Sequence, residues 1–176
     1  MSQPGVIPRA LGSILERDLQ TLRREIEAYP DERSLWQQVP GIINTAGTLV
    51  LHLTGNLQHY LGARLGGTGY RRDRPAEFTR RDVPRAELLR EIDAARSAVR
   101  AGLADLSDAR LSADYPETIA GLGVATGEYL LHLSTHFAYH LGQLDYHRRV
   151  VTGNESGVGA MRPAELSTAR PTGAGA

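Results

Sequence analysis

Four of the chain's six histidines fall in one short segment that is almost free of charged side chains. Residues 132–147 read HLSTHFAYHLGQLDYH, so His136 and His140 stand four residues apart, with His132 one turn before them and His147 two turns after them. On an α-helix, side chains four residues apart lie about 6 Å apart on one face. Two imidazoles can therefore point at one position, and neutral imidazole is a good ligand for zinc, nickel, copper and iron. The spacing predicts a chelating pair.

The other two histidines, His52 and His59, lie in a second segment that lacks charge. His52 is near the middle of that segment, flanked by Leu49 and Leu53, and we take it as the third ligand. A single histidine on an apolar helix is more often a core imidazole with a hydrogen-bond partner. Where three imidazoles converge, a metal site is favoured over three core histidines, because one cation can bind one nitrogen of each ring at once.

Composition narrows the chemistry available around such a site. The 176 residues suit one domain with a core, and 20 basic against 20 acidic residues leave no net charge at pH 7. The lack of net charge favours a small molecule or a protein as partner. We therefore expect a small-molecule substrate, and neither a nucleic acid nor a membrane as partner. Cysteine is absent and every basic residue is arginine, which excludes cysteine nucleophiles, thiolate metal sites and Schiff-base lysines. The lack of cysteine fits a cytoplasmic location, where the environment is reducing.

Helical periodicity appears in four segments, which must position these histidines. Apolar residues recur every three or four positions from Leu11 to Tyr29, where Ser13 and Glu16 have the spacing of a capping box. The further helices are expected at about 44–65, from about 82–84 to 106, and at about 126–151. The second and fourth are nearly free of charge, so we expect them to be the buried pair. All six histidines lie on these two.

The same pattern predicts the fold class. No convincing strand alternation is present, although residues 110–122 could form a short hairpin or an irregular loop. We predict an all-α protein, a four-helix bundle with long links between its helices. Residues 1–152 are expected to form this single domain. Residues 153–176, rich in Gly, Ala, Pro, Ser and Thr, are expected to be a flexible C-terminal tail.

Several polar residues near the histidines are candidates for a pocket or for hydrogen bonds to the ligands: Asn56, His59, Tyr129, His132, Tyr139 and Gln143. Residues 64–90 hold eight arginines with carboxylates interleaved, among them Asp73 and Glu77. We interpret this stretch as salt-linked surface and not as a nucleic-acid site. No Glu or Asp general base is evident beside the histidines, and the catalytic residues stay unknown.

The two histidine segments resemble the DinB/YfiT-like superfamily of metal-binding four-helix bundles, which is unrelated to the DNA polymerase that shares the name. The resemblance rests on LVLHLTGNLQHYL and on LLHLSTHFAYHLGQLDYH, where H-x-x-x-H is followed by Gly-Gln. The stretch GYRRDRPAEF is similar to a recurring segment of one branch. The resemblance covers about residues 10–152 of the chain.

This resemblance implies that His52, His136 and His140 are the three metal ligands. It implies zinc or nickel as the metal, with iron and manganese as further candidates, and it implies a homodimer. It also implies an up-down-down-up bundle, for which the long link at 66–81 is needed. Functions characterised in the wider superfamily include transfer and isomerisation with a low-molecular-weight thiol, and many members have no known reaction. Three neutral ligands leave the cation its full charge and an open position, as in catalytic sites.

Two functions fit these features, and a purely structural bundle is the third alternative. The first is a metal-dependent S-transferase or hydrolase, in which a low-molecular-weight thiol or water attacks a small electrophile. The second is a non-catalytic, stress-associated metal-binding dimer, which the lack of an evident general base favours. His132 and His147 are left as pocket wall, contacts to a ligand, or surface, and His59 is expected to be half-exposed.

Overall fold

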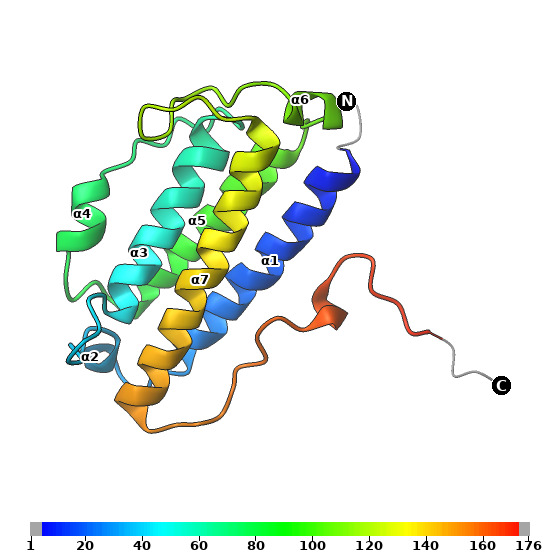
Figure 1. Ribbon diagram of the computed structural model, residues 1–176. Helices are drawn as coiled ribbons and strands as arrows, with labels where there is room; N and C mark the ends of the chain where they lie inside the picture. The colour runs from blue at the N-terminus through cyan, green and yellow to red at the C-terminus, as the bar shows by residue number, and fades with distance from the viewer. Residues whose placement is uncertain (1–4, 173–176) are drawn as a thin grey trace.

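The computed structural model describes residues 5–172, and within that range the chain is all-helical. Four long helices lie side by side (Figure 1): α1 (Val6–Glu27), α3 (Ala46–Leu57), α5 (Arg85–Leu103) and α7 (Thr126–Thr152). A π-helix, η1 (Gln58–Ala63), continues α3. Short helices occupy the links and the C-terminal segment: α2 (Glu32–Leu35), α4 (Arg74–Thr79), α6 (Asp108–Leu111) and η2 (Pro163–Glu165). The predicted all-α class is confirmed.

Each long helix carries an apolar stripe that it buries against its neighbours. α1 packs against α5 and α7, and α3 packs against the same two helices. Along α3 the stripe of Leu49, Leu53 and Leu57 continues into Leu61 of η1, and all four side chains are buried. Each buried leucine contributes about 1.5–3 kcal/mol to the stability of the fold. The core therefore lies between the four helices. Among the described residues, no helix has the length and apolar content to cross a membrane.

Hydrogen bonds at the helix ends show how the elements run. The Gly5 N–H before α1 donates to the Leu106 carbonyl after α5 (3.2 Å), and the Arg85 guanidinium at the start of α5 donates to the Tyr29 carbonyl after α1 (2.7 Å). α1 and α5 are therefore antiparallel. The Tyr29 hydroxyl is 2.8 Å from Nδ1 of His147, so the C-terminal ends of α1 and α7 lie together.

The start of α1 corrects one prediction. The helix begins at Val6, and its N-cap, Gly5, makes no side-chain hydrogen bond. Ser13 and Glu16 consequently lie inside the helix and form no capping box. The physical reason is that Pro8, which suits a first turn, extends the apolar stripe upstream of the expected start.

The prediction that both charge-poor helices are buried holds for α3 only. Every residue of α3 is buried, whereas α7 buries one face and exposes large apolar side chains on another, among them Leu131, Tyr139 and Val150. Absence of charge did not mean burial, because more than half of a protein's exposed surface comes from apolar atoms. α7 therefore has one face toward the core and one toward the outside.

The residues after α7 return along α1. Arg24 of α1 donates hydrogen bonds to the Gly159 carbonyl (3.1 Å) and to the Glu165 carboxylate (3.2 Å). The Ser167 N–H donates to the Ser13 hydroxyl (2.7 Å). These contacts attach the described part of the C-terminal segment to the outer surface of α1.

The predicted division into a domain (1–152) and a flexible tail (153–176) stays a prediction. Residues 1–4 of that domain and 173–176 of that tail lie outside the described residues. Of the two forms expected for residues 110–122, the loop is present from residue 112 on, since only isolated bridges such as that between Ile119 and Leu122 occur there. Arg110 and Leu111 belong to α6.

Candidate metal centre

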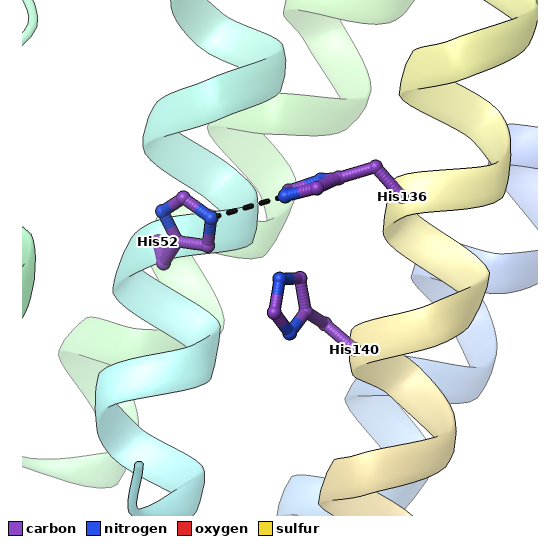
Figure 2. Close-up of side chains that lie close together, drawn as sticks. All are labelled: His52, His136 and His140. Carbon is purple, nitrogen blue, oxygen red and sulfur yellow. Dashed lines mark hydrogen bonds between the residues drawn. The ribbon is translucent and has the colours of Figure 1, made fainter. Parts of the chain in front are cut away.

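Three histidines from α3 and α7 converge within the bundle (Figure 2). His52 comes from α3, and His136 and His140 come from successive turns of α7, and one ring nitrogen of each lies within 4.8 Å of the other two. The Nε2 atoms of His52 and His136 are 3.3 Å apart. Two nitrogens that bind one tetrahedral zinc at about 2.0–2.1 Å are about 3.3 Å apart, so this spacing fits a shared cation. The predicted convergence is present, and metal binding by these nitrogens stays a prediction.

A carboxylate behind His52 sets the orientation of its ring. Glu77 of α4 accepts a hydrogen bond from Nδ1 of His52 (3.0 Å), which leaves the Nε2 lone pair directed toward the other two histidines. Arg72 donates two hydrogen bonds to the same carboxylate, at 2.6 and 2.9 Å. Burial acts to raise the pKa of Glu77, but the hydrogen bonds from His52 and Arg72 outweigh it and hold that pKa below its usual range. Glu77 is therefore ionised at neutral pH.

Gly55, nearly one turn after His52, makes room for this carboxylate. A Cβ atom on Gly55 would lie 2.4 Å from Oε1 of Glu77, which is closer than real Cβ contacts allow. Both Glu77 oxygens are engaged, so the carboxylate cannot move away without losing a hydrogen bond. The glycine in the middle of a buried helix thus admits the group that orients His52.

The two histidines of α7 differ in their surroundings. Nδ1 of His140 lies 2.7 Å from the side-chain oxygen of Gln143, which leaves Nε2 free to face the centre. Nδ1 of His136 is buried and has no hydrogen-bond partner among the described residues. Burial, and then the neighbouring imidazoles, lower the pKa of His136 to about 4, and burial also lowers the pKa of His140. Both rings are neutral at pH 7, the form that binds cations.

An open cavity of about 390 Å³ lies beside the three histidines. Of the predicted pocket residues, Asn56, Tyr129 and His132 line it. Burial raises the pKa of Tyr129, so its phenol stays protonated at neutral pH. No carboxylate of the described residues belongs to the wall of this cavity.

The other three predicted pocket residues do not line this cavity. Gln143 contacts His140 instead, and together with Tyr139 and His140 it lines a second cavity, whose other wall is formed by residues 41–44 and by Leu49 of α3. Tyr139 directly precedes His140, so the helix turns it about 100° away from the centre. His59 lies on η1, where its Nε2 is 3.0 Å from a Glu117 carboxylate oxygen and its side chain is largely buried.

His147 is a core histidine and lies apart from the other three on α7. It is only 1% exposed. Its Nδ1 is 2.8 Å from the Tyr29 hydroxyl and its Nε2 is 2.9 Å from the Gln37 carbonyl oxygen, so both nitrogens have partners. His147 is therefore neither part of the pocket wall, nor a contact of a ligand, nor a surface residue.

Sequence reasoning missed the groups that α4 and the residues before it bring to the site. Glu77 is buried, so the interpretation of residues 64–90 as salt-linked surface is wrong for this residue. Arg72, Arg74 and Phe78 line the cavity and were not predicted to do so. The available signal was the stretch GYRRDRPAEF, which ends on Glu77 and Phe78.

The chain matches one known protein family. Residues 14–144 match the family model of the DinB superfamily, and this match runs from α1 into α7 and includes all three converging histidines. It confirms the resemblance drawn from the histidine segments. No curated protein matches the chain.

Proposed function

Because the chain belongs to the DinB superfamily, we propose that His52, His136 and His140 hold a divalent cation, and that the protein is a metal-dependent S-transferase or hydrolase. The adjoining cavity would admit a small electrophile together with a low-molecular-weight thiol or water. One observation carries the proposal: three ring nitrogens converge beside an open cavity. Zinc and nickel are the first candidates for the metal, since imidazole suits both.

The donor set fits such a cation. In His52 and His140 a side-chain oxygen occupies Nδ1, so each presents Nε2 to the centre. His136 has no competing partner at Nδ1 among the described residues. When bound, the cation would lower the pKa of water or of an external thiol, and so supply a nucleophile to a chain that has no cysteine.

The chain's own residues would bind and orient the reactants. The protonated phenol of Tyr129 can donate a hydrogen bond into the cavity, and Asn56 offers an amide. In the transfer reaction the thiol sulfur forms a bond to the electrophilic carbon, and the leaving group departs with its electron pair. We assign the thiol proton to His132, an exposed imidazole in the cavity wall, because no carboxylate lines that wall.

A non-catalytic metal-binding protein with a stress-associated role is the second candidate. One observation favours it: the carboxylate nearest the ligands, that of Glu77, has both oxygens engaged by His52 and Arg72. It orients a ligand and is not available as a general base. This candidate keeps the same three ligands and differs only in having no turnover.

We retain three further expectations as proposals. The antiparallel packing of α1 and α5, and the shared end of α1 and α7, support an up-down-down-up order. The exposed apolar side chains of α7 support a homodimer. The absence of cysteine supports a cytoplasmic location, and the lack of net charge supports a protein without nucleic-acid or membrane partners.

Elemental analysis of the purified protein tests the metal site. We expect about one zinc or nickel ion per wild-type chain, and a near-complete loss in each of His52→Ala, His136→Ala and His140→Ala. His132→Ala is the matched control, because it removes an imidazole of the same helix that lies outside the converging set. Full occupancy in all three ligand variants would refute the site.

Turnover by the metal-loaded protein separates the two candidate functions. Transfer of mercaptoethanol to chlorodinitrobenzene reports on S-transfer, and release of nitrophenol from nitrophenyl acetate reports on hydrolysis. Either activity, if lost in His136→Ala, supports the enzyme. No turnover with full metal occupancy would favour the non-catalytic candidate.

A further inference from the structure

We propose that Arg74 makes the cavity beside the three histidines an anion-binding subsite, so that the small electrophile taken there carries a carboxylate next to an apolar body. This inference rests on the proposed function, since it names the substrate class of the same site. It concerns a residue that is not one of the three candidate ligands.

Two arginines line the cavity, and only one of them has a partner for its charge. Arg72 is held by two hydrogen bonds to Glu77, and the side chains of this ion pair are 9% and 5% exposed. The side chain of Arg74, at the start of α4, forms no ion pair or hydrogen bond within residues 5–172. Its guanidinium carbon lies 5.2 Å from the centroid of the Phe78 ring. The charge of Arg74 is therefore available to a ligand.

The position of Phe78 connects this charge to the candidate metal centre. The centroid of its ring lies 4.9 Å from that of His52, and both residues line the cavity with Arg74. The Phe78 ring is thus next to both the Arg74 guanidinium and the His52 ring. Tyr60 and Tyr129, whose ring centroids are 5.1 Å apart, add apolar surface to the same wall. A small molecule with its reactive atom at the histidines can reach Arg74 with a carboxylate.

The charge balance of the cavity favours an anion over a neutral or cationic ligand. Glu77 neutralises the charge of Arg72, so the positive charge of Arg74 is left unpaired, and no carboxylate of the described chain lines the cavity. A guanidinium binds a carboxylate through two parallel hydrogen bonds, which fixes the ligand's direction. A divalent cation at the histidines would attract the same ligand. An amine cation would be repelled, and a neutral ligand would leave Arg74 without a partner.

Binding of benzoate, compared with binding of benzamide, tests the subsite. The two probes share a ring and a shape and differ in charge. In an NMR titration of the zinc-loaded protein, we expect the wild type to bind benzoate more tightly than benzamide. Arg74→Gln should weaken benzoate binding by about tenfold and leave benzamide binding unchanged.

Arg71→Gln is the matched control, because it removes the same charge from the same segment. Arg71 is exposed, and it does not line the cavity. This variant should bind benzoate as the wild type does. Equal weakening by both substitutions would assign the effect to net charge and overturn the subsite, and so would unchanged benzoate binding by Arg74→Gln.

The same titrations on metal-free protein separate this inference from the proposed function. Should the protein take up neither zinc nor nickel, the proposed function fails, and the metal-free comparison of wild type with Arg74→Gln still decides the subsite. If the metal-free wild type then binds benzoate about tenfold more tightly than Arg74→Gln does, the subsite is supported. Equal benzoate affinities of the two proteins overturn it. Should zinc bind while Arg74→Gln has no effect, the metal site stands and the subsite is rejected.

Discussion

Two parts of α7 use the same kind of side chain in opposite ways. We call residues 132–143 the site half and residues 144–152 the closed half. In the site half, His136 and His140 face His52 and an open cavity, and Nδ1 of His136 has no partner among the described residues. In the closed half, His147 is buried with both nitrogens hydrogen-bonded to groups from other elements.

The difference lies in what satisfies the polar atoms. An imidazole whose two nitrogens are both bonded to groups other than candidate ligands, as in His147, has no capacity left for a cation. In contrast, the Nε2 atoms of His52 and His136 face each other, and one cation between them can bind both. Charged groups of the closed half are satisfied within the protein in the same way, since the buried guanidinium of Arg148 pairs with Glu25 of α1. Substitutions in the closed half should therefore lower stability and spare metal binding. Substitutions that disturb the site half should weaken metal binding and spare stability.

Arg148→Met in the closed half is expected to have the largest effect. The side chains of Arg148 and Glu25 are both fully buried, and methionine would leave the carboxylate without its cation. Breaking a buried pair from one side costs about 3–5 kcal/mol in the free energy of unfolding, which urea denaturation would measure. The metal content per folded chain should not change. Arg149→Met, which breaks a half-exposed pair with Asp145, should cost less than about 1 kcal/mol.

His147→Phe is expected to come next. Phenylalanine removes two hydrogen bonds and leaves the buried Tyr29 hydroxyl without a partner. We expect a loss of about 2–3 kcal/mol in the free energy of unfolding, again with zinc content unchanged. His132→Phe, at an exposed position of the same helix, is the control and should change stability by less than about 0.5 kcal/mol. Equal stability losses in the two variants would remove the distinction between the halves.

Gly55→Ala tests the site from the opposite helix. Its new methyl group would displace the Glu77 carboxylate and so release His52 from its orientation. Loss of such an orienting partner lowers metal affinity by about 10–100-fold, which competition with a chelating dye would measure. Gly142→Ala is the matched control, because no atom lies within 4 Å of the added Cβ. That control should stabilise α7 by about 0.5–1 kcal/mol and leave zinc affinity as it is.

The smallest expected effect is a pH dependence in the closed half. Burial lowers the pKa of His147 below its usual 6.5, although the Gln37 carbonyl acts to raise it. Folded His147 therefore binds a proton less readily than unfolded His147. Its contribution to stability is present above about pH 6.5 and is lost as the pH falls below that value. Between about pH 7.5 and about pH 5.5, metal-free wild type should lose up to about 1 kcal/mol more than His147→Phe. A smaller loss in the wild type would contradict this assignment.

The part of the site that lies on the long helices could be predicted from the sequence. A spacing of four residues puts His136 and His140 on one face of any α-helix, and this holds without knowledge of the fold. The absence of charge identified the two helices that carry the histidines. His52 lies near the middle of one of them, as His136 and His140 lie near the middle of the other, and this predicted that the three meet. These are local properties, which periodicity reports directly.

The groups that orient the ligands could not be predicted in the same way. Glu77 lies 25 residues after His52, on a short helix within a link, and periodicity does not say where a link returns to the bundle. Its arginine neighbours made it look like surface. The burial of His147 was equally hidden, because its partners come from the end of α1 and from the loop that carries Gln37.

The link between η1 and α5 has a consequence for how this protein can diverge. One stretch of about ten residues holds Glu77 behind His52 and Arg74 in the wall of the cavity. A lineage that inserts, deletes or exchanges residues there to accept a new substrate would also alter how firmly its cation is held. Selectivity and metal retention would be inherited together as a single trait.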